Sequence, residues 1–433
     1  MLSFQLKTIL LTLLLVTGAS TAHANGSPWL PAEEVAYESN GVEMSPADEQ
    51  LRALYAELQN LLWIEDRGGW PEVPADATLE LGMMSEAVET LRIRLVLVGD
   101  LPNRHNQAFG SMEAQTFDFE LLQAVMRFQN RHGLEADGAV GHQTLRALNV
   151  PVAQRIEQVQ RNIRRWEDLE PKLGDDFLIV NIPEFQLRLY DNQQTKLDMR
   201  VVVGKTKSPT PELTEELEYF VMNPYWFVPK RIGVRELLPK AQANPDYLQN
   251  ASYEVWSGNQ RVDTSQVAWD QLDASNFEYS FRQKPGANNS LGKVKFAMPN
   301  PRAIFLHDTP SQSHFEKTRR AYSHGCIRLE EPMRLASALM EMQNGYSEDD
   351  IHARLSVDYT KRIELEEHLP VHVVYLTNWA RAGVVHYFDD IYGRDRQESQ
   401  QREAEVQTYT ASVEPTEQEA RTSLTWSTLA TAQ

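Results

Sequence analysis

The fold is decided by two short stretches, IFLHDT at residues 304–309 and YSHGCIR at residues 322–328. They place the single cysteine of the chain, Cys326, 19 residues after His307, and a second histidine, His324, comes two residues before the cysteine. A free thiol has a pKa of about 8.5, so it is a good nucleophile at neutral pH only beside a base or a positive charge. The spacing therefore indicates a candidate cysteine nucleophile with two candidate bases.

The other residues of the second stretch suit the same chemistry. Gly325 leaves the backbone before the thiol unobstructed, so that main-chain N–H groups could face a developing oxyanion. Arg328 carries a fixed positive charge that could bind a carboxylate.

Each of these residues also has an ordinary structural interpretation. A lone cysteine is most often a small buried hydrophobic side chain, and a histidine at a strand end usually only makes a hydrogen bond. Arg328 could form a surface ion pair with Glu330 or Glu331. A zinc site is a further alternative, and its ligands would be His307, His314, His324 and Cys326. It is the weaker hypothesis, because no carboxylate–histidine pair follows at a suitable helical spacing.

Around these stretches, the pattern of apolar residues favours β-strands. We expect strands at about 177–182, 186–190, 197–203, 219–222, 293–298 and 303–307, and a helix at about 332–342. The stretch from about 233 to 289 breaks the pattern and carries its own aromatic residues, which is typical of a subdomain rather than a loop. With the helical region described below, these elements predict an α+β fold.

The whole pattern resembles a known family. His307 followed by SHGCIR at 323–328 resembles the signature of the L,D-transpeptidases, which have a YkuD-type catalytic domain. Further stretches look like the larger, YcbB-type members, among them NPYWFVP at 223–229, MPN at 298–300, HDTP at 307–310 and DDIYGR at 389–394. The resemblance implies a mainly-β catalytic domain over about 177–394, with a capping insertion at about 233–289.

The resemblance also implies a mechanism of cysteine acyl transfer. Cys326 would be the nucleophile and His307 the general base, oriented by the carbonyl of residue 308 or a neighbouring backbone group, with His324 as a rival base. The thiolate would attack the carbonyl of the third stem-peptide residue, usually diaminopimelate, and release D-Ala. A diaminopimelate side-chain amine would then resolve the thioester to give a 3→3 crosslink. Backbone N–H groups around Gly325 and Cys326 would form the oxyanion hole, and Ser323, His324 and Arg328 would line the pocket.

A second resemblance covers the region ahead of the strands. AVMRFQNRHGL at 124–134, followed by DG at 137–138 and TLRALN at 144–149, resembles the bacterial peptidoglycan-binding domain. That domain is a three-helix module, and we place it at 84–150. A spacer that has lost wall binding, or an unrelated helical bundle, remains an alternative.

Composition and charge narrow the classes of function. The 433 residues suggest two or three domains, and 42% hydrophobic residues are enough to bury a core. The formal net charge of −19 argues against nucleic-acid binding, because a chain with this excess of acidic residues is not suited to neutralising phosphates along its length. One cysteine excludes a disulfide within the chain and any zinc site built on two or four cysteines.

The N-terminus has the three parts of a secretory signal peptide. Lys7 precedes an apolar run at 9–16, small residues follow at 18–20, and Ala-His-Ala occupies 22–24. The run is too short to span a membrane, so we expect cleavage after Ala24. The sequence thus predicts an exported protein without a transmembrane segment in its mature chain, and the resemblance to the L,D-transpeptidases implies a location in the periplasm.

The predicted organisation follows from these assignments. It comprises a signal peptide at 1–24, an N-terminal scaffold segment at 25–83, the peptidoglycan-binding-like domain at 84–150, a linker helix at 151–176, the catalytic domain at 177–394 and a disordered tail at 395–433. The resemblance implies no cofactor. The partners that it implies are peptidoglycan stem peptides, a tetrapeptide donor and a diaminopimelate acceptor, and other cell-wall synthesis enzymes.

Three competing functions stay open. The same thioester could be resolved by water, as in an L,D-carboxypeptidase or amidase, or by a lipoprotein lysine, which would anchor that protein to the wall. The chain could also be a non-catalytic wall-binding scaffold. A zinc D,D-carboxypeptidase is the third alternative, because such enzymes can share the binding module.

Overall fold

The computed structural model describes residues 44–74, 78–103, 110–244, 246–343 and 346–413 of the chain, with side chains up to residue 405 in the last of these ranges. The predicted signal peptide, the predicted segment from 25 to 43 and the last part of the predicted tail (414–433) lie outside the described residues. Within the described ranges, no helix is both long enough and apolar enough to cross a membrane.

The predicted helical module is present. Its helices are α2 (Glu86–Leu97), α3 (Met112–Gln115), α4 (Phe119–Arg131) and α5 (His142–Leu148). Asp118 caps α4 by accepting a hydrogen bond from the backbone N–H of Leu121 at 2.8 Å, as expected for an acidic residue at a helix start. Leu91, Leu121 and Phe128 are fully buried between these helices and form the centre of a separate small core.

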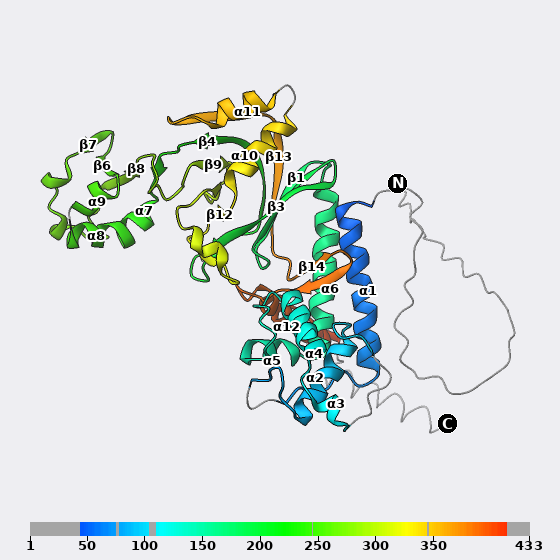
Figure 1. Cartoon of the computed structure of the whole chain (residues 1–433). Coiled ribbons are helices and arrows are strands. Elements are labelled where there is room, and N and C mark those ends of the chain that lie inside the picture. Colours follow the sequence, from blue (N-terminus) through cyan, green and yellow to red (C-terminus); the bar gives the residue numbers. More distant parts are fainter. Residues whose placement is uncertain (1–43, 75–77, 104–109, 245, 344–345, 414–433) are drawn as a thin grey trace, which may run out of the picture. The chain divides into compact units, whose positions relative to one another are not determined.

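Two long helices flank this module in the sequence and pack side by side (Figure 1). They are α1 (Pro46–Asp66) and α6 (Val152–Leu169), and a 3₁₀ turn (Glu170–Lys172) ends α6. Trp166 of α6 is fully buried in their shared core together with Leu54 of α1 and Phe177, the first strand residue. The predicted linker helix therefore joins the helical region to the strands through a common apolar core.

In the described residues, nine strands form the main sheet, in the order β11-β3-β12-β10-β9-β4-β13-β1-β2. These strands are β1 (Phe177–Asn181), β2 (Gln186–Asp191), β3 (Gln194–Gly204), β4 (Leu213–Met222), β9 (Val294–Ala297), β10 (Leu306–His307), β11 (Ala321–Ser323), β12 (Ile327–Leu329) and β13 (Lys361–Val374). Strand β2 also pairs with β3, so the sheet closes on itself. Closure pairs strand edges that would otherwise be exposed.

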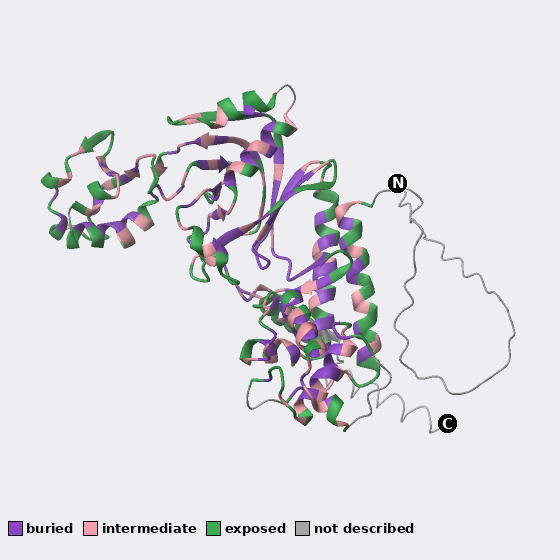
Figure 2. Cartoon of the chain, in the orientation of Figure 1, coloured by how far each residue is buried: buried purple, intermediate pink, exposed green. Residues whose placement is uncertain are grey.

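The interior of this closed sheet is the main hydrophobic core. Alternate strand residues point into it, among them Val201, Phe296 and Leu306, all fully buried (Figure 2). Helices α10 (Pro332–Met342) and α11 (Glu348–Leu355) contribute Leu335 and Ile351 to the same core. A separate hairpin of β14 (Asn378–Arg381) and β15 (Val384–Tyr387) follows β13.

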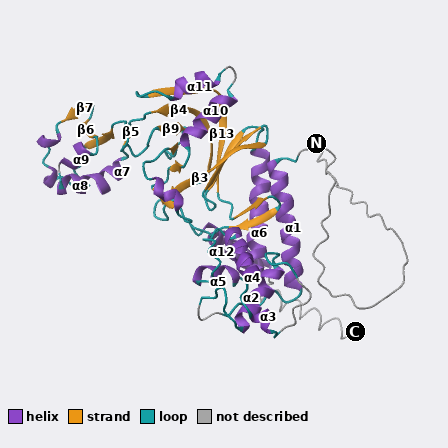
Figure 3. Cartoon of the chain, in the orientation of Figure 1, coloured by secondary structure: helices purple, strands orange, loops and turns teal. Residues whose placement is uncertain are grey.

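The predicted capping insertion is a subdomain with its own sheet and core, and its boundaries differ from the expected 233–289. Its sheet has the order β5-β8-β6-β7, made by β5 (Trp226–Phe227), β6 (Tyr253–Ser257), β7 (Gln260–Val262) and β8 (Tyr279–Gln283) (Figure 3). Its helical segments are α7 (Lys230–Ile232), a π-helical turn (Gly233–Leu237), α8 (Leu238–Ala243), α9 (Asp246–Asn250) and 3₁₀ turns at Thr264–Gln266 and Trp269–Gln271. The subdomain begins at Trp226 rather than at 233, because Trp226 and Phe227 pair with Gln283 and Arg282.

The prediction of a disordered tail from 395 onward is wrong for its first part. The chain forms α12 (Arg394–Val413), and ion pairs with α6 hold the first turns of this helix. Arg165 of α6 binds Asp395 at 2.8 Å and Glu398 at 2.9 Å through its two terminal nitrogens. The composition of this segment is typical of a disordered region. Its sequence does not reveal the helix, because the partner of these acidic residues lies more than 200 positions earlier.

A buried carboxylate ties the turn between β1 and β2 to the β14–β15 hairpin. Glu184 is almost fully buried and binds Arg188 of β2 and Arg381 of β14, with Arg188 Nη1 at 2.8 Å and Arg381 Nη2 at 2.6 Å. Burial alone would raise the pKa of Glu184, but the charges and hydrogen bonds of the two arginines lower it to about 2.

We therefore expect Glu184→Gln to lower the free energy of unfolding at pH 7 by about 3–5 kcal/mol, because it leaves a buried arginine unpaired. The folded-state pKa lies below the ordinary value of 4.5, so this stabilisation is present above pH 4.5 and is lost as the pH falls toward about 2. Urea unfolding of parent and variant at pH 7 and pH 3 measures both effects. Exposed Glu341→Gln is the control, with a change of less than about 0.5 kcal/mol. An equal difference between parent and Glu184→Gln at both pH values would contradict the assignment.

Candidate active site

Strand pairing brings the two sequence stretches together on one face of the sheet. Strands β10 and β12 run parallel, with Leu306 opposite Ile327 and His307 opposite Arg328. Successive side chains of a strand point to opposite faces, so Leu306 and Ile327 enter the core while His307 and Arg328 face the other way. Cys326 precedes β12 by one residue and is two residues from Arg328, which places it at the edge of the same face.

A lysine joins this face from the neighbouring strand. Strand β9 is antiparallel to β10, and Lys295 lies opposite His307. The Lys295 ammonium lies 4.3 Å from the centre of the Phe305 ring, and this ring is tilted against the imidazole of His307 at 5.5 Å between centres. Lys295-Phe296 is a further stretch that looks like the larger YcbB-type members, but the sequence by itself predicted no role in the site for Lys295. Its signal was one charged residue between the apolar Val294 and Phe296 of a strand.

His307 is buried, and its tautomer is fixed by the backbone. Its Nδ1 lies 2.5 Å from the carbonyl oxygen of Asp308 and donates to it, which leaves Nε2 as the nitrogen that can accept a proton. The predicted orientation of the ring by residue 308 is therefore present. Burial, and then the charges of Arg328 and Lys295, lower the pKa of His307 to about 3, so the imidazole is neutral at physiological pH.

Cys326 is a protonated thiol in this environment. Burial raises its pKa, while a backbone hydrogen bond from Phe305 and the charges of Lys295 and Arg328 lower it, and burial is the larger effect. The sulfur lies 3.7 Å from the carbonyl oxygen of Ala303, a residue in the left-handed backbone region with φ of 53°. Thiol and imidazole are thus both neutral before a substrate binds.

The loop before the cysteine is held by its own hydrogen bonds. Gly325 has φ of 122°, a conformation that other residues rarely adopt. Ser323 is buried, accepts from the Gly325 N–H at 3.1 Å and donates to the Cys326 carbonyl at 2.5 Å. Thr210, which is fully buried, donates to the Gly325 carbonyl at 2.8 Å and accepts from the Gly204 N–H at 2.8 Å.

These contacts correct two details of the predicted pocket. The Gly325 N–H is already bonded to Ser323, so it is not a free donor for an oxyanion, and the Cys326 N–H has no hydrogen-bond partner among the described residues. Ser323 shapes the loop instead of lining a pocket. Thr210, far away in the sequence, has the same positioning role, and no local pattern could have identified it.

His324 connects the cysteine loop to the capping subdomain. Its Nε2 lies 2.5 Å from the carboxylate of Glu236, which belongs to the π-helical turn of the cap, and 3.3 Å from the Lys205 ammonium. With Nε2 taken by a cap carboxylate, His324 is less suited than His307 to accept the thiol proton.

Arg328 is placed to receive an anion. Its Nε atom is buried and has no hydrogen-bond partner within the described ranges, and its Nη1 lies 3.5 Å from His314 Nδ1. Burial is also the main reason why the pKa of Arg328 is lowered. An unpaired buried guanidinium nitrogen beside the cysteine loop fits the predicted role of binding a carboxylate.

The four candidate zinc ligands do not form a metal site. Among the described residues, no three His, Cys, Asp or Glu side chains are grouped so that they could hold a metal ion. His307 and His324 face the Asp308 carbonyl and the cap carboxylate respectively.

The charges around the cysteine make a testable prediction for its reactivity. The rate of alkylation of Cys326 by iodoacetamide should rise with pH and show an apparent pKa above that of an ordinary thiol. Lys295→Met should move this pKa higher still, because it removes a charge that favours the thiolate. Lys172→Met, an exposed change in the turn after α6, should leave the profile unchanged. An alkylation rate that already reaches its maximum at pH 7 would contradict the prediction that the Cys326 thiol is protonated and the His307 imidazole neutral.

Comparison with known proteins adds independent information. Residues 175–346 match the family model of the L,D-transpeptidase catalytic domain, and residues 84–148 match that described as "Putative peptidoglycan binding domain". A curated protein of Haemophilus influenzae, "Putative L,D-transpeptidase", is 36% identical over 221 residues, which are 51% of this chain and 45% of that protein. The aligned stretch thus spans less than half of the relative's length.

Alignments with solved structures have low identity and low TM-scores. An L,D-transpeptidase of Stackebrandtia nassauensis aligns over 72% of this chain and 99% of its own, with 15% identity and a TM-score of 0.24. One from Mycobacterium smegmatis aligns over 46% and 58%, with 13% identity and a TM-score of 0.23. By these two matches, residues 175–346 are similar to L,D-transpeptidase catalytic domains of the YkuD type, and residues 84–148 ahead of them are similar to peptidoglycan-binding domains.

Proposed function

We propose that this protein is an L,D-transpeptidase that forms 3→3 peptidoglycan crosslinks by cysteine acyl transfer. The observation that carries the proposal is the placement of His307 and Cys326 on one face of neighbouring strands, beside Lys295 and Arg328, within the matched catalytic domain. A neutral imidazole whose Nε2 has no hydrogen-bond partner among the described residues, on the same face of the sheet as a thiol, suits a general base and its nucleophile.

In the first step, the Cys326 sulfur attacks the carbonyl carbon of the third residue of a tetrapeptide stem, and His307 Nε2 takes the thiol proton. An imidazolium beside two cations is unfavourable, so we expect this proton transfer to accompany formation of the C–S bond. The Cys326 N–H is a candidate donor for the oxyanion. The C–N bond then breaks, His307 returns the proton to the leaving amine, D-Ala departs, and a thioester remains on Cys326.

In the second step, the side-chain amine of a second stem's diaminopimelate attacks the thioester carbonyl. His307 accepts a proton from this amine and passes it to the departing Cys326 sulfur, which restores the thiol. The product is an amide between two third-position residues. Water in place of the amine would give a free tripeptide, which is the outcome of an L,D-carboxypeptidase.

We further propose that the protein acts in the periplasm, where its helical domain holds it to the wall. The signal-peptide pattern at 1–24 and the family match at 84–148 support this location and this role. Peptidoglycan stem peptides are the proposed substrates, and other cell-wall synthesis enzymes are proposed partners.

The function is tested with purified disaccharide-tetrapeptide and mass spectrometry of the products. We expect a dimer that has lost one D-Ala, no product with Cys326→Ala, and a rate lower by roughly 10²–10⁴-fold with His307→Gln. Thermal unfolding of both variants checks that they fold. Free tripeptide as the only product would replace the proposal by an L,D-carboxypeptidase, and no turnover by the parent protein would leave the scaffold alternative.

The contact between Glu236 of the cap and His324 leads to a prediction about whether the thioester reacts with water or with the acceptor amine. Glu236 of the cap binds His324 beside the cysteine, so Glu236→Gln should weaken cap closure and admit water. We expect the ratio of tripeptide to crosslinked dimer to rise several-fold, while Glu278→Gln, an exposed change elsewhere in the cap, should leave the ratio unchanged. An unaltered ratio in Glu236→Gln would show that this contact does not control access of water.

A further inference from the structure

We propose that a pocket beside the cysteine loop binds the carboxylate of the acceptor, the group that neighbours its attacking amine, and that Arg302 is the residue that binds it. The pocket has a volume of about 590 Å³ and is lined by Pro209, Pro211, Glu212, Arg302, Ile304 and Arg394. This inference rests on the proposed function, because it assigns a binding site for the second substrate of that reaction.

The pocket shares two walls with the loop that carries the nucleophile. A Cβ atom at Gly325 would lie 3.4 Å from Ile304 Cδ1 and 3.8 Å from the Pro209 carbonyl oxygen, and both residues line the pocket. Ala303, between the pocket residues Arg302 and Ile304, has its carbonyl oxygen 3.7 Å from the Cys326 sulfur. A group held in the pocket is therefore close to the loop on which the thioester forms.

The two arginines of the pocket differ in whether their guanidinium groups are already bonded to other residues. Arg394 is fixed, because its Nη2 donates to the Thr210 carbonyl at 2.9 Å and its Nη1 binds the Glu212 carboxylate at 2.5 Å. Glu212 thus balances the charge of Arg394. Arg302 is exposed, and its guanidinium forms no hydrogen bond or ion pair with the described residues. The pocket keeps one uncompensated positive charge, and it belongs to Arg302.

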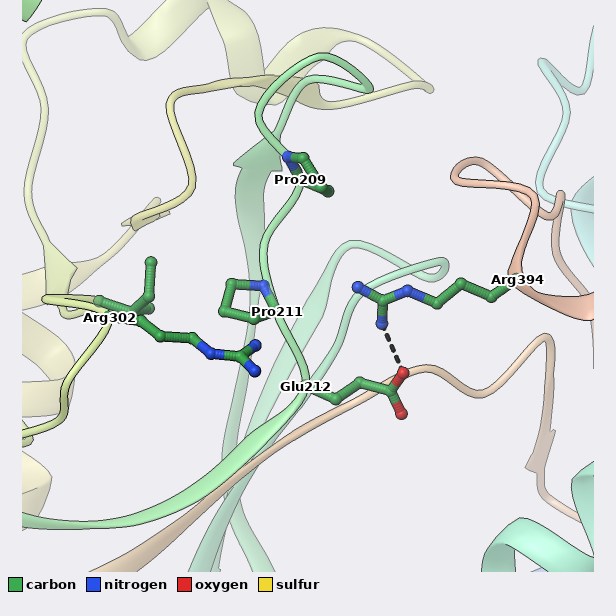
Figure 4. Close-up of a pocket in the computed structure, with 6 residues that line it drawn as sticks. Pro209, Pro211, Glu212, Arg302 and Arg394 are labelled. Carbon is green, nitrogen blue, oxygen red and sulfur yellow. Dashed lines mark hydrogen bonds and ion pairs between the residues drawn. The ribbon is translucent and has the colours of Figure 1, made fainter. Parts of the chain in front are cut away.

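The loop that carries Arg302 is held by one buttressing side chain. Asn300 donates to the carbonyls of Met298 at 2.6 Å and Ile304 at 2.7 Å, and it accepts from the N–H groups of Arg302 and Ile304, each at 3.1 Å. These four bonds support the left-handed conformation of Ala303. The guanidinium groups of Arg302 and Arg394 approach from opposite sides the segment that carries Pro211 and Glu212 (Figure 4).

The chemistry of the acceptor matches a single free arginine. The diaminopimelate amine that resolves the thioester sits on a carbon that also carries a carboxylate. A guanidinium binds a carboxylate through two parallel hydrogen bonds, so it would fix the direction of the neighbouring amine as well as its position. Arg328, on the sheet face with His307, is separate from this pocket and remains the candidate for the donor stem.

The test separates thioester formation from its aminolysis. The acyl-enzyme is formed with disaccharide-tetrapeptide and resolved with D-methionine, which has a carboxylate beside its amine, or with D-methioninamide, which has none. We expect Arg302→Ala to leave the rate of D-Ala release within about twofold of the parent, to slow aminolysis by D-methionine about tenfold, and to leave aminolysis by the amide unchanged. Arg302→Lys should restore part of the rate with D-methionine. Arg334→Ala, an exposed change on α10, is the control.

Equal losses with both acceptors, no loss with D-methionine, or a loss in D-Ala release would each overturn the assignment. A binding measurement keeps the test independent of turnover. In a Cys326→Ala background, calorimetry should show about tenfold weaker binding of disaccharide-tripeptide when Arg302 is also replaced by alanine. If the parent protein forms no thioester, the proposed function fails, and equal affinities of the two binding variants would then reject the pocket separately.

Discussion

The parallel pairing of β10 with β12 is the constraint on which the site depends. It sets His307 beside Arg328 and sends Leu306 and Ile327 into the core, so a shift of one residue would turn the imidazole into the apolar core and the leucine out of it. The buried partners make such a shift costly. The register that stabilises the closed sheet is therefore the register that orients the candidate catalytic side chains.

The electrostatic character of the site follows from this geometry. Burial, and then the charges of Arg328 and Lys295, lower the pKa of His307 and keep its imidazole neutral. Burial also raises the pKa of Cys326 and keeps its thiol protonated. A resting site of this kind avoids an exposed thiolate, which would be readily oxidised. The reactive form would arise only when a substrate carbonyl is in place. The cap contacts the cysteine loop through Glu236 and His324, and in the proposed function this contact helps to exclude water during that event.

Charged residues also hold the parts of the chain around the site. Glu184 joins the β1–β2 turn to the β14–β15 hairpin, and Arg165 holds α12 against α6. Arg394, at the first residue of α12, reaches Thr210, the buried threonine that supports the cysteine loop. The C-terminal helix thus begins at a residue that borders the proposed acceptor pocket.

The sequence by itself determined whatever depends on neighbouring residues. The helical module at 84–150 is recognised from contiguous stretches of sequence, and the stretch at 322–328 indicates a candidate cysteine nucleophile because its chemistry is local. Only the tertiary structure decided which distant groups meet that nucleophile. Three such groups come from another strand, a loop and the cap: Lys295, Thr210 and Glu236. Contacts made by tertiary packing have no fixed spacing in the sequence, so no sequence pattern predicts them. The same reason explains why the sequence predicted disorder where α12 begins. Asp395 and Glu398 bind Arg165, which lies more than 200 positions away in the sequence.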